Sequence, residues 1–131
     1  MVWNRSMGVI ILIALAALSL AAVSMQVVQA TQEPAELTGE IVRIQDIVKD
    51  EPAYDGKNVV VEGKIETECA SGCWFILNDG SASIYVDILP SNFVIPQKSG
   101  KKAKVYGVVT TKDGDPMLIG KIVEIDGEIY R

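Results

Sequence analysis

The segment NVVVEGKIETE, residues 58–68, decides the fold, because its apolar and polar residues alternate along the chain. Val59, Val61 and Ile65 would face one side of an extended strand, and the charged residues beside them would face the other. This alternation predicts a strand with one buried face and one solvated face. Gly63 lies in mid-strand, where glycine weakens the pairing unless the backbone bends, so we expect a sharp bend at this position.

Four further strands are expected, over residues 73–77, 82–89, 102–111 and 116–125. Turn residues separate them, most clearly Asp79 and Gly80, a pair that readily adopts the positive φ of a tight hairpin. A longer gap, residues 90–101, follows the third strand. We expect Phe93 and Val94 in this gap to plug the bottom of the barrel that the strands form.

The order of three strands, a gap and two strands predicts an all-β protein with a small barrel of five strands. In the expected register, alternate apolar residues of the strands meet in one interior. Those that define it are Val59, Ile65, Phe75, Ile84 and Val105.

A short helix is expected before the first strand, over Ile44–Lys49. Ile44, Ile47 and Val48 are spaced i, i+3 and i+4, which places them on one helical face. Pro52 ends the helix, since the residue before a proline is pushed out of the helical region. We expect the apolar face of this helix to cap one end of the barrel.

The first 30 residues have the layout of a secretory signal. Arg5 provides a positive start, the run from Gly8 to Val23 is almost wholly apolar, and Val28 and Ala30 occupy the positions that precede cleavage. An uncleaved membrane anchor is the alternative, because the apolar run is long for a signal. We therefore expect an exported, extracytoplasmic protein that contacts the membrane only through this segment, if it is not cleaved.

The 101 residues that follow are enough for one domain with one modest core. We expect a linker at residues 31–39, the barrel domain at residues 40–126 and a C-terminal tail at residues 127–131. All 17 acidic residues and 11 of the 12 basic residues lie in this part, which gives it a net charge of −6. This charge disfavours nucleic acid and anionic lipid as partners, and it suits a soluble protein outside the membrane or a ligand that is neutral or cationic.

The sequence contains no histidine. This absence excludes Ser-His and Cys-His catalysis, His-ligated haem and zinc sites that mix His with Cys. Glu62, Glu66 and Glu68 share a strand face, but on an open strand surface we expect them to be hydrated rather than to act as an acid–base pair. We therefore expect a non-enzymatic protein with no cofactor and no resident metal.

Three stretches of the chain carry a family resemblance: KNVVVEGKI at residues 57–65, WFILNDGSASI at residues 74–84 and KVYGVV at residues 104–109. They resemble the OB-fold family, in particular its anticodon-binding and replication-protein-like domains. They are similar to the family patterns V-x-V-x-G-x-V and F-x-L-x-D-G-x-x-x-I, and the resemblance extends over residues 57–125. It implies a five-stranded OB barrel that binds its ligand across the exposed face of the second and third strands.

On this chain, the face that the resemblance implies holds Trp74, Ile76, Tyr85 and Asp87. Trp74 and Tyr85 could form a stacking platform, or Trp74 could simply pack over the neighbouring cysteine loop. OB barrels serve many unrelated binding roles. The exposed Trp74 and Tyr85 and the lack of catalytic residues favour a binding module for a small ligand or a protein partner, while the resemblance implies single-stranded nucleic acid or an oligosaccharide as the alternative ligand.

The only two cysteines, Cys69 and Cys73, are separated by three residues. An even number of cysteines in an exported protein favours a disulfide, and a tight turn could bring the sulfurs together. One alternative is a Cu(I) site, which Glu66, Glu68 or Asp79 could approach, and another is thiol exchange. The pattern Cys-x-x-x-Cys-Trp also resembles a smaller set of exported OB-like domains.

Overall fold

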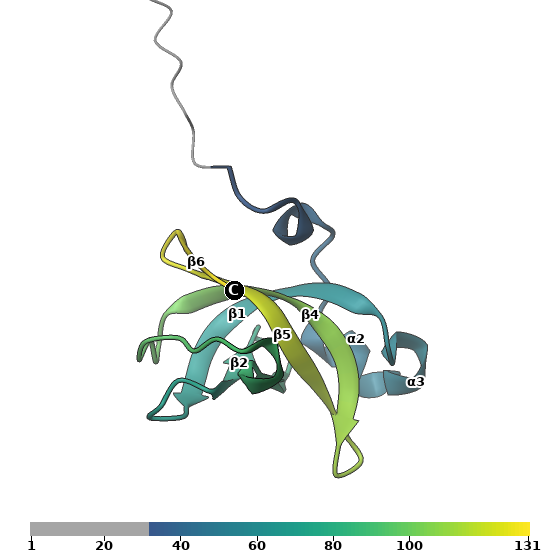
Figure 1. Cartoon of the computed structure of the whole chain (residues 1–131). Coiled ribbons are helices and arrows are strands. Elements are labelled where there is room, and N and C mark those ends of the chain that lie inside the picture. The colour runs from purple at the N-terminus through teal and green to yellow at the C-terminus, as the bar shows by residue number, and fades with distance from the viewer. Residues whose placement is uncertain (1–31) are drawn as a thin grey trace, which may run out of the picture. The chain divides into compact units, whose positions relative to one another are not determined.

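Five strands form a closed barrel in the computed structural model, which describes residues 32–131 (Figure 1). The strands are β1 (Asn58–Glu68), β2 (Trp74–Asn78), β3 (Ser83–Asp87), β4 (Lys102–Lys112) and β5 (Asp115–Ile125). The expected all-β barrel of five strands is therefore confirmed. The expected export segment, residues 1–30, lies outside the described residues. Among residues 32–131, no helix is both long and apolar enough to cross a membrane.

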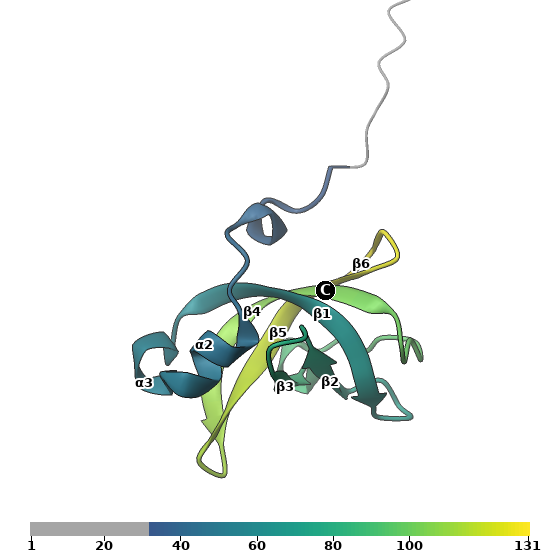
Figure 2. The same ribbon diagram turned by 180° about the vertical axis from the view of Figure 1, so that it is seen from behind.

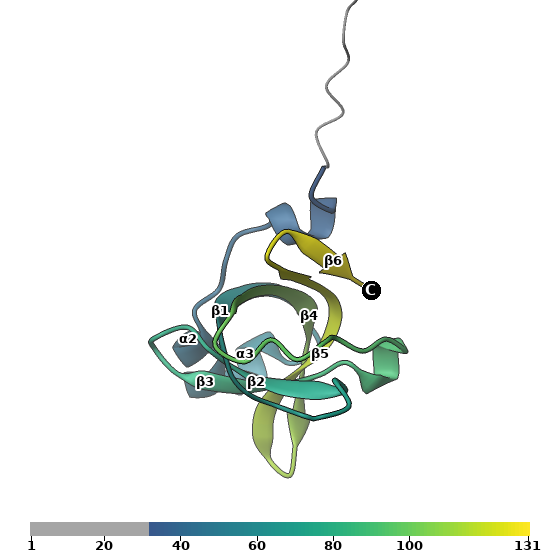
Figure 3. The ribbon, with the colours of Figure 1, turned by 90° about the vertical axis from the view of Figure 1, so that its left-hand side faces the viewer.

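The barrel closes between two strands that run in the same direction. Its strands follow the order β3-β2-β1-β4-β5, in which neighbours pair antiparallel. Residues 85–87 of β3 then pair in parallel with residues 117–119 of β5, which joins the two ends of the sheet. Figure 3 shows the resulting ring of strands. This closure brings the start of β5, and hence the β4–β5 turn, close to β3.

The barrel interior is filled by one cluster of buried apolar side chains, in the register expected from the alternation. The cluster includes Val59, Ile65, Phe75, Ile84 and Val105. Burial of this apolar surface is the main source of stability in a domain of this size. The predicted common interior is therefore confirmed.

Strand β1 is long because it serves both halves of the barrel. Residues 58–64 pair with β4, and residues 64–68 pair with β2. Gly63 lies where β1 changes partner, which is the position expected for its bend. A bulge between Ile65 and Thr67 follows, and it leaves Thr67 exposed, where simple alternation would bury it.

The outer face of β1 is covered near Val60, a residue that alternation would place in solvent. Val60 is buried, its carbonyl accepts the Val42 N–H at 2.8 Å, and it forms a parallel bridge with Ile41. Residues 41 and 42, just before the helix that begins at Ile44, therefore lie against the barrel wall.

Helix α2 (Ile44–Lys49) has the predicted bounds, and Ile44 and Ile47 are fully buried in the barrel core. Val48, which the spacing places on the same apolar face, is 44% exposed. A second helix, α3 (Glu51–Tyr54), follows it with a proline in the first turn, where the missing N–H has no cost. Figure 2 shows both helices beside the barrel.

The gap between β3 and β4 begins with the 3₁₀-helix η2 (Leu89–Ser91). Phe93 packs against the core, as predicted. Val94 is 57% exposed, however, and Ile95 is buried instead. The prediction for Val94 is wrong because the segment after η2 has no helical turn, and alternate residues of an extended chain face opposite sides.

The two ends of the described chain contain more structure than a linker and a tail. Within residues 31–39, the 3₁₀-helix η1 (Ala35–Thr38) carries Leu37, which is fully buried. Within residues 127–131, strand β6 (Glu128–Tyr130) pairs antiparallel with β5. Each segment is short, so a sequence pattern offers too few residues to reveal its packing.

The turn between β2 and β3 caps the start of helix α2. The Asp79 carboxylate accepts the Ile44 N–H at 2.8 Å, and Ser81 Oγ accepts the Gln45 N–H at 3.1 Å. These N–H groups have no partner within their own helix. Partial burial alone would raise the pKa of Asp79, but hydrogen bonds from Ser81, Ile44 and Ala82 lower that pKa to about 2. The turn and the helix therefore stabilise each other.

Asp79→Ala is expected to lower the free energy of unfolding by about 1–2 kcal/mol, the usual cost of a lost helix cap. Asp79→Asn keeps one acceptor oxygen and should lose less. Because the pKa of Asp79 is lower in the folded protein, its stabilisation is complete above about pH 4 and is lost as the pH falls toward 2. Urea denaturation of the three proteins at pH 7 and pH 3 measures both effects. Equal stability of Asp79→Ala and the wild type at pH 7 would contradict the capping role.

Candidate functional site

The four residues predicted to bind a ligand lie together on the outer face of β2 and β3. Trp74 pairs with Asp87, and Ile76 pairs with Tyr85, in the antiparallel register of the two strands. All four side chains are half-buried, whereas the residues that alternate with them face the core. The structure therefore brings the predicted site residues onto one face.

Two aromatic rings dominate this face. The Trp74 and Tyr85 rings stack with their centroids 5.3 Å apart and an angle of 24° between their planes. Lys112 Nζ lies over the Tyr85 ring, 4.3 Å from its centroid. Such a cation–ring contact contributes about 0.5–1 kcal/mol at an exposed site. We call Trp74, Ile76, Tyr85, Asp87 and Lys112 the aromatic face.

Lys112 is the member of the aromatic face that sequence reasoning missed. It lies at the end of β4 and reaches β3 because the barrel closes between β3 and β5. Its only sequence signal was a place in the turn between the last two strands. Asp87 has a local role as well, since its Oδ1 accepts the Leu89 N–H at 3.0 Å and so begins η2.

The two cysteines lie at the edge of the aromatic face. Residues 69–73, which we call the thiol loop, connect β1 to β2, and Cys73 directly precedes Trp74. Cys69 Sγ and Cys73 Sγ are 3.0 Å apart, and both are free thiols in the structure. Ser71 Oγ lies 3.0 Å from Cys69 Sγ and 3.6 Å from Cys73 Sγ. The loop thus brings the sulfurs together, while the disulfide itself stays a prediction.

One thiol of the loop is electrostatically distinct. A hydrogen bond with the Ser71 hydroxyl, and then one with the Cys73 thiol, lowers the pKa of Cys69 to about 6. A cysteine with such a pKa is largely a thiolate at neutral pH, and the thiolate is the reactive form. The chemistry that the loop can perform is therefore nucleophilic attack on sulfur or binding of a soft ion.

The carboxylates expected near the thiols have other partners. Glu68 accepts the Lys98 and Ser99 N–H groups, and Glu66 accepts hydrogen bonds from the Asn78 amide and the Ser83 hydroxyl. Asp79, the third of these carboxylates, lies in the β2–β3 turn and caps helix α2. Within residues 32–131, no three His, Cys, Asp or Glu side chains are grouped so that they could hold a metal ion. The thiol loop therefore lacks additional metal ligands from this part of the chain.

The comparisons with known proteins identify the fold. No protein-family model matches the sequence, and no curated protein matches it. Among solved structures, the chain is similar to the hypothetical protein YgiW from E. coli, with 19% identity and a TM-score of 0.50 over 66% of this chain and 90% of that one. It is also similar to asparaginyl-tRNA synthetase from Pyrococcus horikoshii, in complex with asparaginyl-adenylate, with 18% identity and a TM-score of 0.53 over 66% of this chain. This match spans only 22% of the synthetase chain.

A third match is a putative aspartyl-tRNA synthetase from Leishmania major Friedlin, with 15% identity, a TM-score of 0.52 and coverage of 75% of this chain and 22% of that one. The barrel is an OB fold. The strand order, the parallel closure between β3 and β5 and these matches agree on it. At such identities, the likeness extends to the fold alone.

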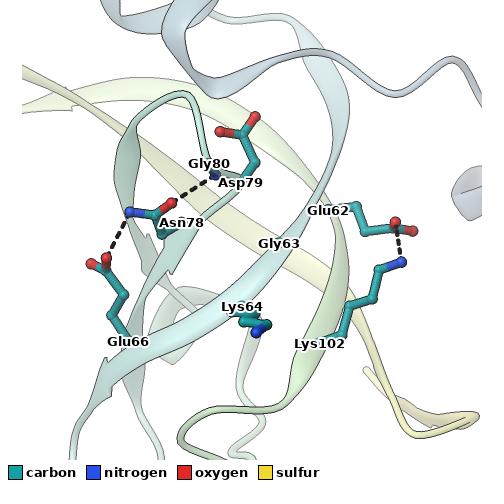
Figure 4. A pocket seen from close by; sticks show the side chains of 8 residues that line it. All are labelled: Glu62, Gly63, Lys64, Glu66, Asn78, Asp79, Gly80 and Lys102. Atoms are coloured by element: carbon teal, nitrogen blue, oxygen red, sulfur yellow. Dashed lines mark hydrogen bonds and ion pairs between the residues drawn. The ribbon is translucent and has the colours of Figure 1, made fainter.

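A large surface hollow lies elsewhere on the OB barrel, between the bend of β1 and the β2–β3 turn (Figure 4). It has a volume of about 760 Å³ and is lined by Glu62, Gly63, Lys64, Glu66, Asn78, Asp79, Gly80 and Lys102. Several of its polar groups bond to one another: Glu62 to Lys102 at 2.7 Å, and Asn78 to Glu66 at 2.6 Å. These four polar groups of the hollow are therefore already bonded to one another.

Proposed function

We propose that this chain is an exported OB-fold module that binds its ligand on the aromatic face, and that this face has a non-enzymatic, binding role. One observation supports this function above all others. The Trp74–Tyr85 stack stands on the outer surface of β2 and β3 with a lysine held over one ring.

The position of this stack on the fold supports the proposal. OB barrels bind oligonucleotides and oligosaccharides on the face of their second and third strands, between the loop that joins strands one and two and the loop that joins strands four and five. In this chain, the thiol loop joins β1 to β2, and Lys112 ends β4 just before the β4–β5 turn. The aromatic face therefore lies between the two loops that border OB-fold ligands.

The chemistry of the face suggests the class of ligand. The indole ring of Trp74 offers a flat apolar surface. Asp87 is the cross-strand neighbour of Trp74 and Lys112 lies over the Tyr85 ring, so the aromatic face carries one charge of each sign. The net charge of −6 after residue 30 repels polyanions. We therefore propose a ligand with a flat or apolar ring and little negative charge, either a small molecule such as an oligosaccharide or the side chain of a protein partner.

Trp74→Ala is expected to weaken ligand binding by about 5-fold to 150-fold, since one stacking contact contributes about 1–3 kcal/mol. Fluorescence titration of the full chain carrying Trp3→Phe, in which Trp74 is the remaining tryptophan, screens neutral oligosaccharides and aromatic small molecules. Calorimetry with a ligand so found then measures the loss in Trp74→Ala. Val48→Ala, which removes an exposed apolar side chain on α2, is the matched control and should bind normally.

Two results would contradict this proposal. If Trp74→Ala and Val48→Ala bound the ligand equally well, the aromatic face would not be the site. If a random single-stranded oligonucleotide bound tightly at low salt, with affinity that fell steeply as salt was added, the ligand would be a polyanion.

A further inference from the structure

The thiol loop holds two sulfurs close together in the absence of a bond between them. Cys69 Sγ and Cys73 Sγ are 3.0 Å apart, and a disulfide needs about 2.05 Å. A movement of roughly 1 Å would therefore interconvert the dithiol and the disulfide. We propose that Cys69 and Cys73 form a thiol–disulfide exchange site that acts on a disulfide-bearing partner.

The dithiol form of the loop is anchored by backbone hydrogen bonds from three directions. The Cys69 N–H donates to the Trp74 carbonyl at 2.9 Å, the Ile88 N–H donates to the Cys73 carbonyl at 3.1 Å, and the Ile95 N–H donates to the Gly72 carbonyl at 3.1 Å. Within the loop, the Gly72 N–H donates to the Cys69 carbonyl at 2.9 Å. Because these bonds hold the loop without a disulfide, both redox states can keep the same backbone, as reversible exchange requires.

The two cysteines have different roles in the exchange. Ser71 Oγ lies 3.0 Å from Cys69 Sγ, where either group can donate, and 3.6 Å from Cys73 Sγ; once Cys69 is a thiolate, the Ser71 hydroxyl donates to it and stabilises it. Cys73 Sγ lies within reach of Cys69 Sγ. Cys69 is therefore the attacking thiol, Cys73 is the resolving thiol, and Ser71 is a positioning residue.

The exchange balances in two steps. The Cys69 thiolate attacks one sulfur of the partner disulfide, forms a mixed disulfide and releases the other partner sulfur as a thiolate, which takes up a proton. Cys73 then loses its proton and attacks Cys69 Sγ, which releases the second partner thiol. The protein gains the Cys69–Cys73 disulfide, and two electrons reduce the partner disulfide to two thiols. The reverse sequence oxidises a partner dithiol.

The observations favour exchange over the two other interpretations of this cysteine pair. A structural disulfide would serve to hold the loop in one conformation, but backbone hydrogen bonds already hold it. A metal that needs three or more ligands is disfavoured, because the nearby carboxylates Glu66 and Glu68 accept hydrogen bonds from other groups, while Cu(I), which two sulfurs can hold, is separated from exchange by the experiment. Both interpretations nevertheless predict results that the following experiment separates from exchange.

Glutathione disulfide is the probe, applied to the reduced full-length chain and followed by alkylation and mass spectrometry. The wild type is expected to lose both thiols together, to retain no glutathione at equilibrium and to recover both thiols in excess reduced glutathione. Cys73→Ser is expected to stop at the first step and keep one glutathione on Cys69. Cys69→Ser should form its mixed disulfide at least about threefold more slowly at pH 7, since a larger thiolate fraction outweighs the weaker nucleophilicity of a low-pKa thiol.

A positioning role for Ser71 has its own readout in the same assay. Ser71→Ala is expected to slow the first step by about threefold while the thermal stability of the chain changes little, and Ser71→Thr is expected to restore the rate. A change in stability with an unchanged rate would show that Ser71 has only a structural role.

Three results would overturn the proposal. A Cys69–Cys73 disulfide in the folded wild type that excess reduced glutathione cannot open would be a structural bond. Equal rates for Cys73→Ser and Cys69→Ser, both matching an unstructured cysteine peptide, would show that the loop activates neither thiol. A reduced wild type that keeps added Cu(I) through desalting and does not exchange with glutathione disulfide would have a metal site.

Discussion

Replacing Gly63 with alanine is expected to lower the free energy of unfolding by about 3 kcal/mol, at the upper end of the usual cost of overpacking. An added Cβ would overlap the Asn78 carbonyl oxygen and would lie 2.7 Å from the Asn78 carbonyl carbon. Both are backbone atoms of the paired strand β2, so neither can move aside as a flexible side chain can. Gly63 lies where β1 passes from β4 to β2, and a shift there disturbs both halves of the barrel.

Gly39→Ala is the matched control, since its Cβ would lie 3.5 Å from the Val60 side chain, an ordinary contact distance. We expect its stability to stay within about 0.5 kcal/mol of the wild type, as for most surface substitutions. Urea or guanidinium denaturation followed by circular dichroism measures both variants. Equal stability of Gly63→Ala and Gly39→Ala would mean that β1 does not bend tightly against β2.

Gly72→Ala is expected to have an effect of similar size, about 3 kcal/mol, for two reasons. The φ of Gly72 is +75°, a conformation that costs a residue with a side chain about 1–2 kcal/mol. The added Cβ would also overlap the Ile95 carbonyl oxygen and would lie 3.1 Å from the Ile95 nitrogen and carbonyl carbon. The loop would have to leave the segment before β4, and the Ile95 N–H bond to Gly72 would be lost. The two thiols should then separate and exchange more slowly with glutathione disulfide.

Gly80→Ala separates the two causes. Gly80 also has a positive φ, of +89°, but nothing lies within 4 Å of the position that its Cβ would occupy. This variant is expected to lose about 1 kcal/mol from backbone strain alone and to exchange normally. Thermal denaturation and the exchange rate measure both variants. If Gly72→Ala lost no more stability than Gly80→Ala, the close packing of the thiol loop on residue 95 would be refuted.

The barrel could be predicted because its signal is repeated along the chain. Alternation in β1 places Val59 and Ile65 inward, and the same period holds in β2, β3 and β4, whereas an irregular register interrupts it in β5. The Asp-Gly turn and the mid-strand Gly63 also agree with the fold that forms. Local signals that agree with one another are what make a fold readable from one sequence.

The coverings of the barrel could not be predicted in the same way. Burial of Leu37 and Val60 depends on a short segment folding back onto the outer wall, which no periodicity reports. Ile95, rather than the predicted Val94, is buried in the core because the chain follows an extended path after η2. These contacts depend on tertiary closure, whereas a sequence pattern describes only one element at a time.

The candidate site shows the same division. Trp74, Ile76, Tyr85 and Asp87 share a face because strands have a period of two, so their placement could be predicted. The contact of Lys112 with the Tyr85 ring depends on the parallel closure of β3 against β5, and the closeness of the thiols depends on a loop. Neither has a periodic signal in the sequence.

The most direct test of binding on the aromatic face is a map of backbone amide chemical shifts, recorded by NMR while a ligand found by the Trp74 titration is added. The predicted shift changes concentrate in β2, in β3, in the thiol loop and around Lys112. Changes that cluster instead around Glu62 and Lys102 in the hollow of Figure 4, or on helices α2 and α3, would contradict the account.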